Sequence, residues 1–536
     1  MKECFYNIIK QQCRSIFICG IIYIFMAALD LSAPFLSKAV FDGLVDKMTY
    51  SYILQCVLML ICLIVFRIGF NYFFEWLLPI MKCKAGFSLK MEILQRLRKI
   101  SILAYQQYDP LYLNARINSD VEKVVDFFLE NYVKLVINGL MLFVYVYIIA
   151  TVSRSVALVV LLLIPFYLLL YKHFRAQLYD LSYEYKERDS ELSQVFSEQL
   201  LQMEEVKIQG NYSLHNNYLW KKFAGVYPSF KKHAQKKSCF NRLGAVLYHA
   251  GQAVLLARGG YGVLKGEITV GTLIMLSQYL ALIIDMIAYF LSVSASYQEV
   301  KVSLVRLKEI FVLAPEPVGT KKLESIEQLA CKLSFSYIKD IAVLKDVCLE
   351  GIKGKAYGVT GNNGCGKSTF LKVLSGILPL EGKNFLSYNG NSASQLNFEY
   401  LRCKRIGYVT QKFFMSNKMV KELFEEIDEK ITLNKLSSYL SWLTLEQLEL
   451  VKISIEPFWQ QNINTLSGGQ KQMIAIVRVL CKKPDLLLLD EPCASLDAVH
   501  KQWLASVIQT VKEHAIVIMI THNKEMHSVC DQLICV

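Results

Sequence analysis

The chain has 536 residues, of which 54% are hydrophobic and only 20% are charged. This length is too great for one domain, and this composition is too apolar for an ordinary soluble protein. The net charge is +13, but the basic residues gather beside apolar segments, which favours anionic lipid headgroups over nucleic acid as their partner.

Six apolar segments before about residue 300 are predicted to span a membrane, because each is close to or above the roughly 18 to 20 residues that a bilayer crossing needs. They are expected at 14–41, 51–80, 128–151, 155–173, 240–264 and 271–296. No small-residue cleavage site follows the first segment, so it is expected to be a retained span and not a secretory signal.

The loops between these segments predict their orientation. The long connections at 81–127 and 174–239 are rich in Lys and Arg, whereas the short links offer little beyond Lys47, Arg154 and Lys265. Basic loops stay on the cytoplasmic side. Both long connections and both termini are therefore expected in the cytoplasm, with the protein in the cell membrane.

The long connections are expected to continue the membrane helices into the cytosol. The stretch 183–206, for example, lacks Gly and Pro and alternates charged with apolar residues at helical spacing. Turn-forming residues interrupt this pattern at 108–110 and at 210–213, where the chain is predicted to reverse.

A few ionisable residues lie inside the predicted spans and are expected to face the bundle interior, because charge is costly in lipid. They are Arg67, Glu75, His249, Arg258 and Asp285. His249 and Asp285 lie at similar depth, so they are a candidate pair or substrate contact. A purely structural polar pair is the alternative.

After Leu333 the pattern changes to strand-like segments separated by helical ones. The predicted strands are 356–359, 405–409, 486–489 and 516–520. This alternation predicts an α/β domain with a largely parallel sheet. The expected organisation is a transmembrane domain at 1–310, a linker at 311–323 and this α/β domain at 324–536, whose motifs indicate the ligand it binds.

The segment 361–369 follows a predicted strand and opens a predicted helix, as a phosphate-binding loop does. It reads Gly361, Asn362, Asn363, Gly364, Cys365, Gly366, Lys367, Ser368 and Thr369. Its glycines let backbone N–H groups surround phosphates, Lys367 would reach the β- and γ-phosphates, and Ser368 would bind Mg²⁺. An ordinary glycine-rich turn is the alternative.

Two acids end the apolar strand 486–489. Asp490 lies at the carboxyl edge of the predicted sheet, where it would hold Mg²⁺. Glu491 follows it and would polarise the water that attacks ATP. A solvated helix N-terminus would show the same two acids.

The pentapeptide 466–470 narrows the resemblance to one superfamily. Ser467, Gly468, Gly469 and Gln470 follow a leucine and match the signature motif of ABC transporters at every position. In that family the motif caps the ATP held by a partner domain, so the resemblance implies a dimer.

Other family positions have counterparts in this chain. Gln411 resembles the glutamine that senses Mg²⁺, and His522 resembles the switch histidine. Asp497 resembles the aspartate at the dimer seam, and Tyr337 occupies the place of the aromatic ring that stacks on adenine. For Tyr337, core packing is the alternative.

The membrane half resembles ABC exporters more weakly, in the stretches 116–121 and 266–271. The resemblance implies short coupling helices at about 107–114 and 209–217. The chain departs from the family before the signature, where 459–465 lacks the usual Gly-Glu pair, and at Met473, which replaces a common arginine.

The resemblance implies an exporter-type half-transporter that hydrolyses ATP with Mg²⁺ and pumps as a homodimer, or as a heterodimer with a second half-transporter. The expected substrate is a peptide, with lipids and amphipathic drugs as alternatives. An ATP-regulated channel or receptor subunit, and an importer with the same fold, are the competing functions.

Overall fold

The computed structural model describes residues 2–108, 110–338, 341–380, 384–411 and 417–536. The chain divides into two compact units. The helical unit comprises Met1–Arg96 and Pro110–Val312, and the α/β unit comprises Leu97–Asp109 and Leu313–Val536. The α/β unit is therefore built from two separate stretches of chain.

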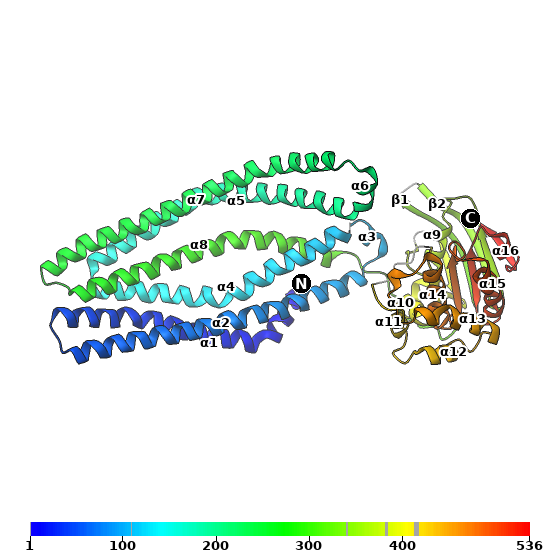
Figure 1. Ribbon diagram of the computed structural model, residues 1–536, viewed down its shortest axis with the longest axis horizontal. Helices are drawn as coiled ribbons and strands as arrows, with labels where there is room; N and C mark the ends of the chain where they lie inside the picture. Colours follow the sequence, from blue (N-terminus) through cyan, green and yellow to red (C-terminus); the bar gives the residue numbers. More distant parts are fainter. Residues whose placement is uncertain (1, 109, 339–340, 381–383, 412–416) are drawn as a thin grey trace. The chain divides into compact units, whose positions relative to one another are not determined.

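Within the described residues, the helical unit contains six helices of 43 to 53 residues and one short helix (Figure 1). They are α1 (Lys2–Val45), α2 (Tyr50–Arg98), α4 (Pro110–Val152), α5 (Arg154–Leu201), α6 (Met203–Gln209), α7 (Tyr212–Leu264) and α8 (Val270–Val312). Each predicted span lies inside one long helix. Among the described residues, α1, α2, α4 and α8 contain stretches apolar enough to cross a membrane, and the count of six crossings stays a prediction.

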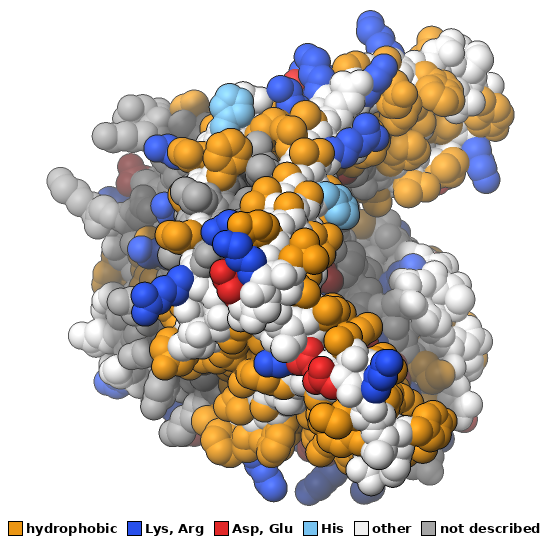
Figure 2. Space-filling model, turned by 90° about the vertical axis from the view of Figure 1, so that its left-hand side faces the viewer, with side chains coloured by type: hydrophobic (Ala, Val, Ile, Leu, Met, Phe, Trp, Pro, Cys, Tyr) orange, Lys and Arg blue, Asp and Glu red, His pale blue; other side chains and the backbone are white. Residues whose placement is uncertain are grey.

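The core of the helical unit lies between α1, α4 and α8. Tyr145 of α4 and Tyr279 of α8 are almost fully buried there, with ring centroids 5.4 Å apart. Apolar residues such as Leu58 and Phe66 on the outer face of α2 are exposed. Figure 2 shows hydrophobic side chains over much of the end of the unit at which α1 is joined to α2. Apolar outer faces are what a helical bundle presents to lipid.

The two exporter-like stretches, 116–121 and 266–271, form contacts that hold neighbouring helices together. Gly271 begins α8 so close to α1 that a Cβ would meet the Lys38 carbonyl oxygen, and its N–H donates to Asp42 at 2.8 Å. In the other stretch, the buried Asp120 of α4 accepts hydrogen bonds of 2.8 Å from Ser303 and Arg306 of α8. Both stretches therefore hold α8 against its neighbours.

The second predicted chain reversal is confirmed, whereas the first contains Asp109, outside the described residues; the short helices lie earlier than the predicted coupling-helix ranges. The second reversal is at Gly210, which ends α6 at φ 65°, and at Asn211, which caps α7. The short helices are α3 (Ile102–Gln106) and α6, not 107–114 and 209–217. In the first range, Asp109 lies outside the described residues, and Pro110 already begins α4.

The ionisable residues of the spans differ in their surroundings. Arg67 pairs with Asp30 of α1, and Asp285 lines a cavity described below. His249 is exposed on α7, with its ring 5.1 Å from that of Tyr248, and it is not among the residues that line the cavity. The structure therefore does not support the pairing of His249 with Asp285.

The α/β unit contains two sheets. The first has strand order β2-β1-β4-β5, with all neighbours antiparallel, and the second has order β6-β7-β8-β3-β9, with all neighbours parallel. The bounds are β1 (Gln328–Ile338), β2 (Ile341–Ile352), β3 (Ala356–Thr360), β4 (Phe385–Tyr388), β5 (Asn391–Ser392), β6 (Ile406–Val409), β7 (Leu486–Asp490), β8 (Ile516–Ile520) and β9 (Gln532–Cys535). The predicted parallel sheet is confirmed.

Helices flank these sheets and complete two apolar cores. They are α9 (Lys367–Leu374), α10 (Phe398–Lys404), α11 (Val420–Glu425), α12 (Leu436–Tyr439), α13 (Leu445–Ile455), α14 (Gly468–Leu480), α15 (Ala498–Lys512) and α16 (Lys524–His527). Fully buried apolar residues fill β7 and β8, as expected of central parallel strands covered on both faces.

Helix α3 belongs to the α/β unit although it lies between two membrane helices in sequence. Ile100 forms an antiparallel bridge with Pro315, and the side chains of Ile102 and Leu103 pack against the core that also contains Phe398. The turn between α2 and α4 is thus part of this unit's apolar core.

Candidate nucleotide site

The parallel sheet gathers the predicted site residues at one edge. Parallel strands all end on the same side of a sheet, where ligands bind in such folds. Strand β3 leads into the phosphate loop, β6 leads to Gln411, β7 ends at Asp490, and β8 leads to His522. Four stretches that are far apart in sequence therefore deliver polar side chains to one place.

The loop 361–366 has the conformation that a phosphate cradle requires. Gly364 and Gly366 have φ angles of 84° and 102°, which other residues rarely adopt. A Cβ at Gly361 would lie 2.5 Å from the Val536 carbonyl oxygen and 2.7 Å from the Cys365 sulfur. Asn362 and Asn363 complete the turn, and α9 begins at Lys367.

Lys367 is 7% exposed and folds over its own loop. Its ammonium group donates to the carbonyl oxygens of Gly361, at 2.9 Å, and Asn362, at 3.0 Å. These neutral acceptors hold the cation at the mouth of the loop, where phosphate oxygens would be stronger partners.

The pair Ser368 and Asp490 offers oxygen ligands of the kind Mg²⁺ prefers. Asp490 is 4% exposed at the end of β7, and burial raises the pKa of its carboxyl group. A hydrogen bond from Ser368 and the charges of Lys372 and Lys367 oppose that rise. A buried carboxylate beside a hydroxyl fits a divalent cation, because the cation would offset the cost of ionising the acid.

Glu491 lies between Gln411 and His522. Its carboxylate accepts a hydrogen bond of 2.8 Å from the Gln411 amide, and its other oxygen lies 3.8 Å from Nε2 of His522. The backbone of Glu491 has φ 50°, an uncommon angle for a residue with a side chain. Strain of this kind is typical of functional sites.

Tyr337 lies beside the start of α9. Its hydroxyl is 3.1 Å from that of Thr369, and its ring makes an edge contact with Phe335 at 5.0 Å between centroids. The side chain is 44% exposed, so core packing does not account for it. An exposed ring next to the phosphate loop is available for stacking on a base.

The signature residues form the N-terminus of the 13-residue helix α14. Ser467 accepts from the N–H of Gln470 at 3.3 Å, and the Gln470 side chain accepts from the N–H of Ser467 at 2.8 Å, a reciprocal cap. Ser467 and Gly468 are exposed, and a Cβ on Gly469 would meet the Ser495 carbonyl oxygen at 2.5 Å. The motif therefore presents a helix N-terminus, which attracts anions.

Asp497 caps the next helix, α15. It accepts from the N–H of His500 at 2.9 Å and pairs with the ring of His500 at 2.8 Å. These two hydrogen bonds from His500 lower the pKa of Asp497. Within one chain this residue is thus a helix cap.

Gln472 is a site residue that the sequence analysis missed. It is 2% exposed, and its amide donates to the Glu491 carbonyl oxygen at 3.1 Å while accepting from the Ser495 N–H at 3.0 Å. It thereby connects the signature helix to the loop that carries Glu491. Its position two residues after the signature was the available signal.

The fold and this edge of the sheet define a nucleotide-binding ATPase domain fused to a helical membrane domain. The family model for the ABC transporter transmembrane region matches residues 16–287, and that for the ABC transporter matches residues 344–494. The chain belongs to the ABC transporter family. It is an integral membrane protein, an ATP-hydrolysing transporter with the architecture of an exporter-type half-transporter.

Individual relatives are similar along nearly the whole chain. YgaD of Bacillus subtilis, whose name assigns it provisionally to multidrug export, is 22% identical over 98% of this chain and 93% of its own. The lactococcin-G-processing and transport protein LagD of Lactococcus lactis is 23% identical over 98% of this chain and 74% of its own.

The solved structure of a bacterial Atm1-family ABC exporter with ATP bound has the same fold. The TM-score is 0.82 at 17% sequence identity, covering 98% of this chain and 93% of that one. The predicted fold class is confirmed.

Proposed function

We propose that this chain is half of an ATP-driven exporter that works as a dimer by alternating access in the cell membrane, with both termini cytoplasmic. The substrate we favour is a peptide, with lipids and amphipathic drugs as alternatives. The observation that carries the proposal is the position of Glu491, hydrogen-bonded to Gln411 and close to His522 at the nucleotide edge of the sheet.

The phosphate loop binds ATP in this proposal. Backbone N–H groups of 361–369 surround the phosphates, and Lys367 exchanges its two carbonyl partners for β- and γ-phosphate oxygens. The exposed Tyr337 stacks on the adenine. ATP therefore replaces weak internal contacts of the loop with charge-assisted ones.

Ser368, Gln411 and Asp490 would hold Mg²⁺, and its charge would neutralise the phosphates. Glu491 polarises the attacking water, and His522 holds the γ-phosphate in line with it. The hydrogen bond between Gln411 and Glu491 joins the cation site to the catalytic acid, so the two form together.

The exposed helix N-terminus at Ser467 supports the dimer. Its N–H groups are directed at no anion of the unit described, and they fit the γ-phosphate held by a second half-transporter. Asp497 meets the partner at the same seam. A homodimer would contain two complete sites, because one chain carries every residue needed, and a heterodimer is the alternative.

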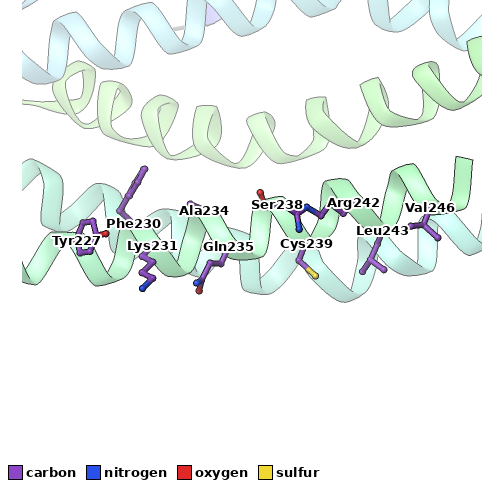
Figure 3. A pocket seen from close by; sticks show the side chains of 10 residues that line it. All are labelled: Tyr227, Phe230, Lys231, Ala234, Gln235, Ser238, Cys239, Arg242, Leu243 and Val246. Carbon is purple, nitrogen blue, oxygen red and sulfur yellow. The ribbon is translucent and has the colours of Figure 1, made fainter. Parts of the chain in front are cut away.

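A groove along α7 also supports a partner. It has a volume of about 680 Å³, and its lining residues, from Tyr227 to Val246, all lie on this one helix (Figure 3). Its face mixes apolar Phe230 and Leu243 with Lys231 and Arg242. The groove runs from the predicted cytoplasmic extension of α7 into the predicted span at 240–264, and such an uncovered face is suited to packing on another chain.

Relatives named for multidrug export and for lactococcin G transport support export as the direction. Vesicle orientation tests it: uptake into inside-out vesicles supports export, and uptake only into right-side-out vesicles would establish an importer.

The decisive experiment measures Mg²⁺-dependent, vanadate-sensitive ATPase activity of the full chain in lipid. We expect Glu491→Gln to lower kcat by roughly a hundredfold or more while ATP binding persists, since the substitution removes the catalytic carboxylate and leaves the phosphate loop intact. Glu513→Gln, at an exposed carboxylate after α15, is the matched control and should keep wild-type activity. Near-zero wild-type activity that Glu491→Gln does not change would favour the channel or receptor function.

A further inference from the structure

A polar cavity lies among α1, α2, α4 and α8 of the helical unit. Its volume is about 520 Å³, within the range of small-molecule sites. Its ionisable lining consists of four acids, Asp30, Glu75, Glu130 and Asp285, and two bases, Arg67 and Lys134. A cavity of this kind at membrane depth is costly unless something offsets its charge.

The depth follows from the helix bounds. Asp30 lies 15 residues before Val45, the end of α1, and Asp285 lies 15 residues after Val270, the start of α8. At 1.5 Å per residue, both lie about 22 Å from those helix ends. Both acids are therefore inside the hydrocarbon layer, about 30 Å thick, that these helices are predicted to cross.

Two of the four acids already have cationic partners. Arg67 pairs with Asp30, while Glu130 is 3.1 Å from the Lys82 ammonium group and 4.0 Å from that of Lys134. These pairs neutralise one side of the cavity.

The other two acids, Glu75 and Asp285, lack a cation. Within the described part of the chain, Glu75 is bonded only to the Asn71 amide, at 2.9 Å, and Asp285 has no hydrogen-bond or ion-pair partner. The cavity thus holds two carboxylates more than its own cations neutralise.

A separate observation indicates a ligand. Tyr145 is 1% exposed and lines the cavity, yet among the described residues its hydroxyl has no hydrogen-bond partner. Asn138, which is 8% exposed, uses its oxygen to accept from Tyr23 at 2.8 Å, and its amide N–H₂ also lines the cavity without a partner among these residues. Both residues line the cavity, where a ligand can supply the hydrogen-bond partner that each group lacks among the described residues.

We infer that this cavity binds the cationic group of an amphipathic substrate, with Glu75 and Asp285 as its counter-ions. Glu75 and Asp285 are exposed to the open cavity, and an ionised carboxylate attracts a cation within a few ångströms. The rings of Tyr145, Tyr289 and Phe74 line the same space and suit an apolar or aromatic body attached to that cation. The inference rests on the proposed export function and specifies the charge of the substrate.

The test uses two probes of one shape and opposite charge, tetraphenylphosphonium and tetraphenylborate. Equilibrium binding is measured on the full chain in phosphatidylcholine nanodiscs without nucleotide, and binding to empty nanodiscs is subtracted. We expect the wild-type protein to bind the cation at least tenfold more tightly than the anion. Equal binding of both probes would overturn the inference, and this comparison needs no variant.

Variants locate the site. Asp285→Asn and Glu75→Gln should each weaken cation binding about tenfold, which is about 1.4 kcal/mol, and together about a hundredfold. Asp285→Glu keeps the charge and should retain binding within a few-fold. Glu267→Gln, an exposed acid in the link before α8, is the matched control and should change nothing. Cation binding that survives both neutralisations would refute the assignment.

The same samples separate this inference from the proposed function. ATPase activity without charge-selective binding would overturn the cation site and leave the pump intact. Charge-selective binding that requires Glu75 and Asp285, in a protein without ATPase activity, would support the site and overturn the pump.

Discussion

Gln472 allows a direct test of how the signature helix controls the catalytic acid. The side chain is buried, and its amide bridges the main chain of Glu491 and Ser495. The substitution Gln472→Met keeps the length and removes both hydrogen bonds. Any effect therefore comes from the lost bridge and not from a cavity.

The expected magnitude follows from the two main-chain groups that lose a partner. Each buried unsatisfied group costs about 1–3 kcal/mol, so a rigid loop would lose about 2–6 kcal/mol of stability. The loop can recover part of this by moving toward water. The backbone of Glu491 has an unfavourable φ of 50°, so the loop is expected to shift to a more favourable angle once the bridge is lost. Displacing a catalytic group by about 1 Å can lower the rate a hundredfold.

We expect Gln472→Met to lower kcat between tenfold and a hundredfold while the Kd for ATP stays within a few-fold, since the phosphate loop is untouched. The assay is steady-state ATPase activity with ATP binding measured in parallel. Gln447→Met is the matched control, because Gln447 is also buried and its amide donates to Ser506 and Thr510 of α15, outside the loop that carries Glu491. The control should lose stability but keep kcat. Equal kcat values for the two variants would refute the positioning role.

Four further predictions concern Asp490, Tyr337, Asp120 and Cys365. Burial raises the pKa of Asp490, so the ionised carboxylate destabilises the fold at a pH above that raised pKa. Asp490→Asn should therefore raise the melting temperature of the ligand-free protein at neutral pH, and it should abolish Mg²⁺-dependent hydrolysis. The gain in melting temperature should disappear as the pH falls toward the ordinary pKa of an aspartate, because the wild-type carboxyl group is then neutral as well. Tyr337→Leu should weaken ATP binding by about 1 kcal/mol, whereas Tyr337→Phe should leave it within twofold, as nucleotide titration would show. Asp120→Ala should lower the stability of the helical unit by about 1–3 kcal/mol, because Ser303 and Arg306 of α8 lose their buried acceptor. The loss is at the lower end for a buried ion pair because Arg306 is partly exposed to solvent. Alkylation of Cys365 should block ATP binding, with Cys365→Ala resistant; equal inactivation of both proteins would contradict this.

The sequence predicted the nucleotide edge well, because each element there has a local pattern. Continuous apolar runs identified β7 and β8, and glycine spacing identified the loop before Lys367. The parallel strands then place Gln411 and Glu491 together by topology alone. Roles of these residues stay predictions until the kinetic tests are made.

The features that the sequence did not predict depend on contacts between distant segments. The antiparallel sheet was missed although buried and less buried residues alternate along β1, because the strand order β2-β1-β4-β5 depends on pairing between separate segments of the chain. The candidate pairing of His249 with Asp285 is not supported by the structure, because equal depth along two helices does not fix which way each helix face points. Gln472 was overlooked because a single glutamine carries no pattern.

The insertion of residues 97–109 into the α/β unit has a practical consequence for dissecting this protein. A recombinant fragment that begins near residue 313 would lack Ile102 and Leu103 and would leave the apolar surface that they cover open to water. Such a fragment is expected to aggregate more readily and to be less stable than the same residues in the full chain. Kinetic work on an excised ATPase domain should therefore supply the α3 segment, either as a fused peptide or in trans.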